Sequence, residues 1–341
     1  MRSLLPEVNA SLDQPNLDFT LFEAILATVN TLGGEPSREI ADQESLQKLM
    51  SKEGLSESVK VNLLRLARPN EQSFGLEQWL ELKNHGSSAI LQELVRTIGV
   101  AGNEDANHFL KKIIKDSDVP DSIRADAIAS FQPSSQSDTD LLLSLTSSKA
   151  RAIREESLRS LRFQFLDKKH HIKLGEIKKT FPDSGDLVDA ILAPDNLSKD
   201  RPTANDFEKW RQLIDHVKAP VDSNAGRRIF SHARIATCNK CHRHSGRGNI
   251  LGPDLTNLSR SADRDRVLTS LLQPSQQIDP QYHGRSLLLQ DGTTFTGILL
   301  RDGGGGREVY RNLDGKEQVL LTDDIVQRRE TTTSLMPEGL L

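Results

Sequence analysis

Residues 87–99 are SSAILQELVRTIG, and their pattern returns as VPDSIRADAIASF at 119–131 and as ARAIREESLRSLR at 150–162. In each stretch, side chains four positions apart fall on one face of a helix. The members of this face are Ile90, Leu94 and Ile98, then Ile123, Ala127 and Phe131, then Ile153, Ser157 and Leu161. The leading isoleucines are 33 and 30 residues apart. The spacing therefore predicts amphipathic helices that recur along the chain and bury equivalent faces.

A second helix is expected in the intervals between these stretches. Residues 106–116 (ANHFLKKIIKD) and 138–148 (DTDLLLSLTSS) carry apolar side chains at helical spacing. Asp121 and Asp138 stand where helix N-caps are expected. A helix pair with this period is typical of an α-solenoid. We therefore expect residues 1–218 to form a helical repeat region similar to HEAT repeats, and an irregular helical domain with chance spacing is the alternative.

The composition is that of a folded globular chain. Of the 341 residues, 36% are apolar and 27% are charged, and the formal net charge is −4. Aromatic residues make up only 4%, which favours helices over β-sandwiches. No long basic run indicates nucleic acid or anionic lipid as a partner. No apolar stretch is long enough for a transmembrane segment, and the N-terminal sequence lacks the apolar core of a secretory signal.

The regular helical pattern weakens before the last third of the chain. Pro182, Pro194 and Pro202 divide this part into short helical pieces. Trp210 lies in one of these pieces and is expected to anchor a core rather than to bind a ligand. We place a domain boundary after residue 218, so that the second domain spans residues 219–341.

Strand signals are concentrated in residues 284–330. Apolar-rich runs flank Asp291–Gly292 and Asp314–Gly315, and an Asp-Gly pair between such runs predicts a tight hairpin. The four glycines at 303–306 are expected to connect the two hairpins loosely. The pattern predicts a small β-hairpin insertion within an otherwise helical domain.

The sequence C-N-K-C-H at residues 238–242 carries the chemistry of the second domain. From one helical turn, the thiols of Cys238 and Cys241 can reach the two vinyl groups on one edge of a porphyrin. His242 follows directly, where its imidazole can bind the iron. This is the spacing of a c-type haem attachment site, so we expect one covalently attached haem c.

Two other kinds of site could use the same thiols. A zinc site would combine the cysteines with two of His232, His242 and His244, but no second C-x-x-C supports it. A thioredoxin-like dithiol requires a βαβ setting, whereas a helix and a glycine-rich loop are expected around this motif. The chain carries no P-loop, dinucleotide fingerprint or Ser-His-Asp constellation.

Gly252 and Pro253 lie within LGPDLTNL, and Pro253 stands eleven residues after His242. The pair resembles the loop of class I cytochromes c in which a proline carbonyl accepts a hydrogen bond from the iron-bound histidine. Such a bond orients the ring and raises its basicity. Arg260 is a candidate for a haem propionate, with a solvated surface arginine as the alternative. The expected pocket residues are Leu251, Leu255, Leu268 and Leu272.

Met336 is the expected sixth ligand of the iron. The chain has three methionines, and only this one lies in the second domain. It precedes Pro337, and a residue before proline avoids the helical region, which suits an extended loop that approaches the iron. Methionine and histidine together raise the reduction potential of a haem. His283 and His244 are the next candidates.

Several spaced motifs together resemble a known family. They are C-N-K-C-H, LGPDLTNL, SLLQPSQQIDPQY, LLLQDGTTFTGIL, DDI and SLMPEG, and they lie within residues 224–340. They resemble the haem-binding cytochrome c domain of planctomycete and verrucomicrobial type, which usually follows HEAT-like repeats and often a β-propeller similar to sugar dehydrogenases. The resemblance implies thioethers at Cys238 and Cys241, with His242 as proximal and Met336 as distal ligand.

The chain departs from that family in two respects. Family members continue past the methionine loop into a C-terminal helix, whereas this chain ends five residues after Met336. The helix face with Gly226, Ile229 and Phe230 would therefore need another partner. Haem is attached to this motif outside the cytoplasm, yet no signal is visible. We expect a periplasmic or otherwise extracytoplasmic protein, and a misplaced start or a missing upstream portion is the simplest explanation of the absent signal.

The expected function of the second domain is single-electron transfer. The protein would supply the axial ligands, an apolar pocket and a partly exposed haem edge. The helical repeats would dock a redox partner, namely a dehydrogenase that donates electrons, and a downstream acceptor would take them. A fragment of a haem-containing dehydrogenase or peroxidase and a zinc-binding repeat scaffold are the alternatives, so catalysis by this chain alone is left open.

Overall fold

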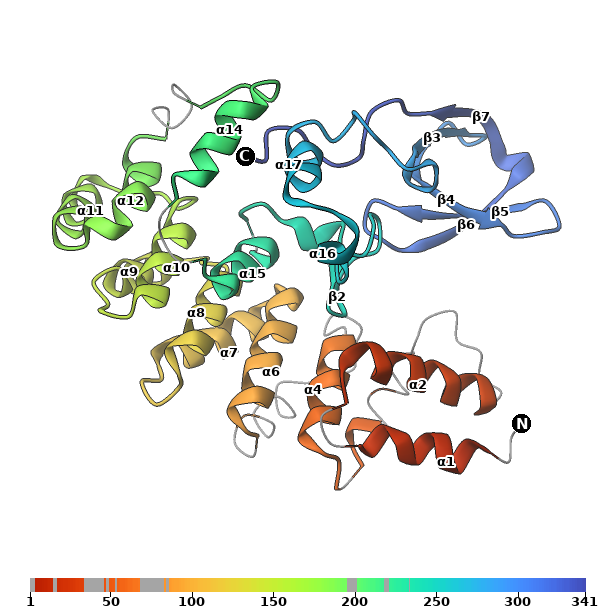
Figure 1. Ribbon diagram of the computed structural model, residues 1–341, viewed down its shortest axis with the longest axis horizontal. Helices are drawn as coiled ribbons and strands as arrows, with labels where there is room; N and C mark the ends of the chain where they lie inside the picture. The colour runs from red at the N-terminus through yellow and green to blue at the C-terminus, as the bar shows by residue number, and fades with distance from the viewer. Residues whose placement is uncertain are drawn as a thin grey trace. The chain divides into compact units, whose positions relative to one another are not determined.

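Helices make up most of the regular structure, which confirms the prediction of a mostly α protein. The computed structural model describes residues 4–14, 17–33, 46, 49–52, 54–67, 83, 86–194, 201–217, 221–232 and 234–341 (Figure 1). The chain forms two compact units. The first is Met1–Lys199 with Ser223–Ile235, and the second is Asp200–Asp222 with Ala236–Leu341. The predicted boundary after residue 218 lies outside the described residues.

The helices of the first unit follow the predicted alternation. They are α1 (Leu5–Ala10), α2 (Phe19–Gly33), α4 (Glu57–Leu66), α6 (Ser88–Ala101), α7 (Glu104–Lys115), α8 (Asp121–Ser130), α9 (Gln136–Leu145), α10 (Arg151–Leu161), α11 (Lys168–Thr180), α12 (Gly185–Leu192) and α15 (Ser223–Ser231). α4, α6, α8, α10 and α12 pack against one another in sequence order. Between them, α7, α9 and α11 begin at residues 104, 136 and 168, which is 32 residues apart each time.

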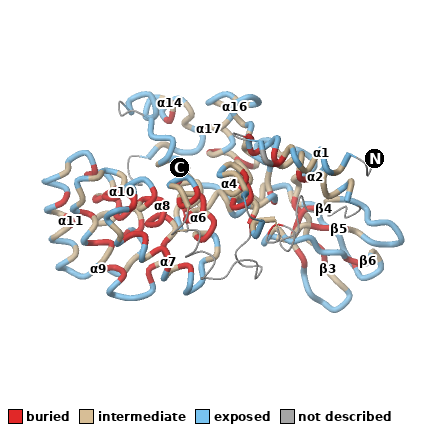
Figure 2. Tube along the Cα trace, turned by 90° about the horizontal axis from the view of Figure 1, so that it is seen from below, coloured by how far each residue is buried: buried red, intermediate tan, exposed pale blue. Residues whose placement is uncertain are grey.

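The predicted apolar faces form the core of this unit. The equivalent positions in α6, α8 and α10 are buried, as the red stretches of these helices in Figure 2 show. Ser157 is the one polar member of the set, and it is fully buried. Its hydroxyl donates to the backbone carbonyl of Ile153 at 2.8 Å, so the polar group is satisfied within its own helix.

The two predicted N-caps are wrong. Asp121 is the first residue inside α8, where Pro120 is the N-cap, and Asp138 lies inside α9, where Ser135 is the N-cap. A capping residue needs extended backbone, which Ser135 has and a residue inside the helix does not. The Asp138 carboxylate instead accepts a hydrogen bond from Lys111 of the neighbouring α7.

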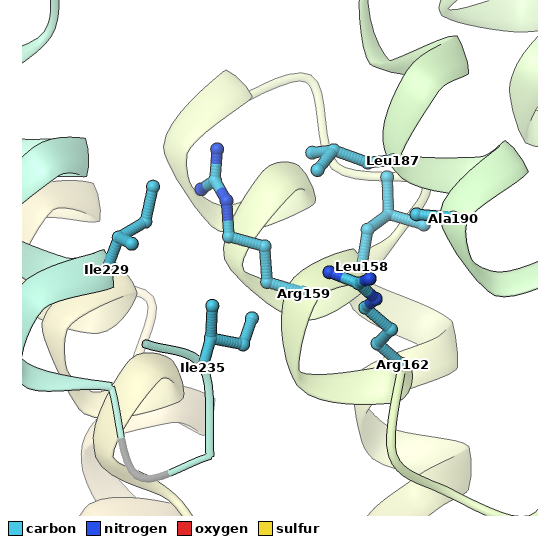
Figure 3. Close-up of a pocket in the computed structure, with 7 residues that line it drawn as sticks. All are labelled: Leu158, Arg159, Arg162, Leu187, Ala190, Ile229 and Ile235. Carbon is cyan, nitrogen blue, oxygen red and sulfur yellow. The ribbon is translucent and has the colours of Figure 1, made fainter. Parts of the chain in front are cut away.

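α15 packs within the first unit, against α8. Arg228 is buried there, and its Nε donates to Glu156 of α10 at 2.7 Å. Ile229 lines a cavity of about 190 Å³ (Figure 3). The other lining residues are Leu158, Arg159, Arg162, Leu187, Ala190 and Ile235. α15 thus meets the first unit through its buried Arg228, whereas Gly226 is exposed and Ile229 and Phe230 are half-buried, so a partner for that face stays a prediction.

In the second unit, α14 (Phe207–Asp215) packs on α17 (Arg264–Leu272), and α16 (Leu258–Ser261) is a single turn. Trp210 is buried against Leu268 and Leu272, which confirms it as a core residue. Its indole Nε1 donates to the Thr203 carbonyl at 3.1 Å. An ion pair between Arg211 and Asp265 joins the same two helices.

The strands of the second unit form a two-stranded and a five-stranded antiparallel sheet. The small sheet pairs β1 (Arg243–His244) with β2 (Arg247–Gly248). The larger one contains β3 (Gly284–Leu289), β4 (Thr294–Asp302), β5 (Arg307–Asn312), β6 (Glu317–Leu321) and β7 (Ile325–Glu330), in the order β6-β5-β4-β3-β7. Its core consists of Leu287, Phe295, Tyr310, Leu320 and Ile325.

Both predicted hairpin turns are confirmed. Gly292 (φ 81°) and Gly315 (φ 80°) take the left-handed backbone that these two turns require. The prediction of a loose connector at residues 303–306 is wrong, because Gly303 donates to the Arg307 carbonyl at 2.8 Å and closes a turn from β4 to β5. The two hairpins are consequently parts of one continuous sheet, which β7 completes by pairing with β3.

Candidate functional site

The C-N-K-C-H residues form one tight turn of the second unit. The backbone N–H groups of Cys241 and His242 both donate to the Cys238 carbonyl, at 3.1 and 2.8 Å. Just before the turn, Ala236 (φ 54°) and Thr237 (φ 49°) hold the left-handed backbone that sends the chain into it. Both thiols are half-buried, and desolvation by burial raises the pKa of each. The turn thus brings the two cysteines and the histidine together.

The imidazole of His242 is held by the loop that follows. Its Nδ1 lies 2.9 Å from the carbonyl oxygen of Pro253, and this is the hydrogen bond expected from the sequence. A carbonyl only accepts, so Nδ1 carries the proton and Nε2 keeps the lone pair that a metal requires. Gly252 lies against the ring, since a Cβ there would be 2.6 Å from Cε1 of His242. Glycine is therefore the residue that lets the loop approach the imidazole this closely.

Backbone hydrogen bonds fasten this loop to the motif. Gly252 donates to the Cys241 carbonyl at 2.7 Å, and Asn249 donates to the Asn239 carbonyl at 2.9 Å. Gly248 has a φ of 99°, and a Cβ at this position would lie 3.0 Å from the same Asn239 oxygen. The glycine-rich loop is thus folded back over the turn that carries the cysteines.

Two side chains join the loop to the five-stranded sheet, and both were missed by sequence reasoning. Asn249 Nδ2 donates to the Asp314 carbonyl at 2.9 Å. Arg311 Nη1 donates to the Ile250 carbonyl, also at 2.9 Å. The sequence signals the loop by its glycines and the turn by its Asp-Gly pair. Nothing in the sequence signals the contact between them.

Met336 lies in the segment that follows β7. Its backbone N–H donates to Ser334 Oγ at 3.1 Å, and the Ser334 N–H donates to Ser275 Oγ at 3.1 Å. These bonds fasten the segment beside the end of α17. They do not bring the Met336 sulfur to His242, so Met336 as the sixth ligand stays a prediction.

The alternative histidine ligands have other surroundings. Nδ1 of His283 lies 2.6 Å from a Glu330 oxygen, and its Nε2 lies 3.3 Å from the Ile278 carbonyl. Both ring nitrogens of His283 are therefore engaged, which disfavours it as an iron ligand. His244 is exposed on β1.

His232, one of the histidines considered for a zinc site, has other partners. His232 is buried in the first unit, where its Nδ1 accepts hydrogen bonds from the N–H groups of Arg234 and Ile235. Its Nε2 lies 3.4 Å from Ser160 Oγ, so both nitrogens have protein partners. In the described part of the chain, no three His, Cys, Asp or Glu side chains are grouped to hold a metal ion.

The expected pocket leucines divide into two sets. Leu251 is buried within the loop that holds His242, and Leu255 is half-buried. Leu268 and Leu272 instead pack on Trp210, so helix packing takes up their apolar surface. Arg260 is exposed, as expected if it is a solvated surface arginine.

Comparison with known proteins adds no relative. No model of a protein family matches the chain, and no curated protein matches it. The resemblance to a haem-binding family therefore rests on the sequence motifs. Over the described ranges, no helix is long and apolar enough to cross a membrane.

Proposed function

We propose that this chain is a c-type cytochrome that transfers single electrons. The observation that carries the proposal is the hydrogen bond from His242 Nδ1 to the Pro253 carbonyl, made beside a C-x-x-C-H motif. It sets the tautomer in which Nε2 can bind iron, and the two thiols of the same turn suit thioether formation. Cys238 and Cys241 would hold haem c through thioethers and His242 would bind its iron, and Met336 is the proposed second iron ligand.

The remaining residues of the site would act through these ligands. When bound, the haem would supply one-electron iron chemistry. The Pro253 carbonyl orients the imidazole and increases its electron donation. Gly252 leaves room for the ring, and Leu251, which precedes it in the loop, is buried. The two half-buried thiols of this turn would attach the haem covalently, through one thioether each.

The finer fold assignment belongs to the same proposal. We infer that the paired helices of the first unit form a HEAT-like α-solenoid, and that the second unit is a class I cytochrome c-like domain with an inserted sheet. The constant spacing of α7, α9 and α11 supports the first assignment. Stacked repeats offer extended binding surfaces, so the first unit would dock a redox partner. The donor would be a dehydrogenase, and the site of action extracytoplasmic, in a periplasm.

Co-expression of the chain with a periplasmic haem-maturation system tests the proposal. We expect one haem per chain that survives denaturant and acid-solvent extraction, together with a reversible one-electron titration. Cys238→Ser and Cys241→Ser should each lose a thioether, and the double variant should lose covalent attachment. His216→Ala is the matched control, because this histidine of the second unit is exposed and lies outside the motif and its candidate ligands. Haem that is fully extracted, or one equivalent of zinc, would refute the proposal.

A further inference from the structure

We propose that the five-stranded sheet of the second unit is a clamp on the loop that positions His242. The sheet would then tune the histidine ligand through the backbone of residues 249–253, without touching the ring. The haem part of this inference rests on the proposed function. The mechanical part rests on contacts among residues of the second unit.

The first contact is made by Asn249 at the β5–β6 turn. Its Nδ2 donates to the Asp314 carbonyl at 2.9 Å, and its Oδ1 accepts from the Ile250 N–H at 2.8 Å. Gly315 completes the fit, because a Cβ there would lie 1.8 Å from Asn249 Oδ1. The turn and the loop are therefore complementary only with glycine at position 315.

The second contact is made by Arg311 on β5. Its Nη1 donates to the Ile250 carbonyl at 2.9 Å, while its Nη2 lies 3.5 Å from Glu317 on β6. The planar guanidinium thus spans the loop and the neighbouring strand. With Asn249, it fixes two consecutive loop residues to the sheet. Gly252, which packs on the His242 ring, follows two residues later.

These contacts have a consequence for the ligand. The Pro253 oxygen that accepts from His242 belongs to the main chain, so its position depends on the loop backbone that precedes it, residues 249–253. If the sheet releases Ile250, this backbone gains conformational freedom and the bond to His242 Nδ1 weakens. A weaker bond makes the imidazole a poorer electron donor, which favours ferrous iron. Loss of the clamp should therefore raise the reduction potential.

Amide hydrogen exchange on the full chain without haem tests the mechanical part. In Arg311→Ala, the Gly252 N–H should exchange about tenfold faster, the factor expected for the net loss of one hydrogen bond. Arg301→Ala is the matched control, because Arg301 pairs with the same Glu317 at 3.1 Å and is exposed. Protection of the β3 and β4 amides checks that the sheet remains folded. Equal exchange at Gly252 in both variants would overturn the clamp.

Redox titration of the haem-loaded chain tests the second part. Arg311→Ala and Asn249→Ala should have higher potentials than the wild type, Arg301→Ala should match it, and Arg311→Lys should recover part of the shift. A wild type without covalent haem would refute the proposed function, and the exchange experiment would still decide the clamp. Loaded variants with unchanged potentials would refute the tuning role alone.

Discussion

Arg228 of α15 and Glu156 of α10 form an ion pair that is almost completely buried. Nε lies 2.7 Å from Oε1, and the two side chains are 3% and 0% exposed. Arg159 donates to the same oxygen at 2.6 Å. Desolvation by burial raises the pKa of Glu156 even beside these two guanidinium groups. The pair fixes α15 to the helices of the first unit, although 72 residues separate the partners in sequence.

Arg228→Ala should lower the free energy of unfolding by about 3–5 kcal/mol, because it leaves a buried carboxylate without one of its partners. Urea unfolding monitored by far-UV circular dichroism measures the change. Lys178→Ala is the control: Lys178 and Asp189 are about half-exposed, and breaking such a pair costs at most about 1 kcal/mol. Equal losses for both variants would show that α15 is not held by this pair.

The buried imidazole of His232 should make the folding stability of the chain depend on pH. Burial lowers its pKa to about 4 in the folded chain, compared with an ordinary value of 6.5. Between these values the unfolded chain binds a proton that the folded chain does not, so stability is full above pH 6.5 and falls as the pH decreases toward 4. The total loss is on the order of 3 kcal/mol.

His232→Gln should flatten the stability profile between pH 4 and 6.5, since glutamine does not titrate. Thermal unfolding at half-unit pH steps measures the slope. His171→Gln is the control, because His171 is exposed on α11. A profile that keeps its slope in His232→Gln would assign the pH dependence to other groups.

Gly252→Ala should displace the imidazole of His242. The added Cβ would stand 2.6 Å from Cε1, so the ring or the loop has to move. We expect a loss of about 1–3 kcal/mol in the free energy of unfolding, the usual cost of overpacking, and an altered haem spectrum in the loaded chain. Gly226→Ala is the control, because its Cβ would meet nothing within 4 Å and α15 should become more stable. A neutral Gly252→Ala would mean that the ring is not confined.

The local elements of this chain could be predicted from sequence because their signals are local. Helical spacing located the buried faces of α6, α8 and α10, and Asp-Gly pairs located two hairpin turns. The resemblance of Gly252–Pro253 to the loop of class I cytochromes c implied a hydrogen bond from His242 that is present at 2.9 Å. Each of these patterns depends on backbone geometry within a dozen residues, which neighbouring sequence largely determines.

The contacts over long sequence distances could not be predicted. Arg228 lies in a polar stretch of α15, and nothing local indicates that its partner is Glu156. The same holds for Arg311, which reaches a loop carbonyl 61 positions away. Such contacts depend on how the elements pack. A single sequence does not distinguish a charged side chain that is solvated from one that is buried in an ion pair. The residues that hold the proposed haem loop in place were missed for this reason.

Met336→Ala should open the sixth coordination position of the loaded chain. Removal of the thioether should lower the reduction potential and let ferric haem bind cyanide rapidly, because methionine ligation favours ferrous iron. Met50→Ala is the control, since Met50 packs on the apolar core of the first unit. If Met336→Ala binds cyanide no faster than the wild type, Met336 is not the ligand, and His244→Ala is the next variant to measure. Rapid binding by the wild type would instead indicate an open site, as in a peroxidase.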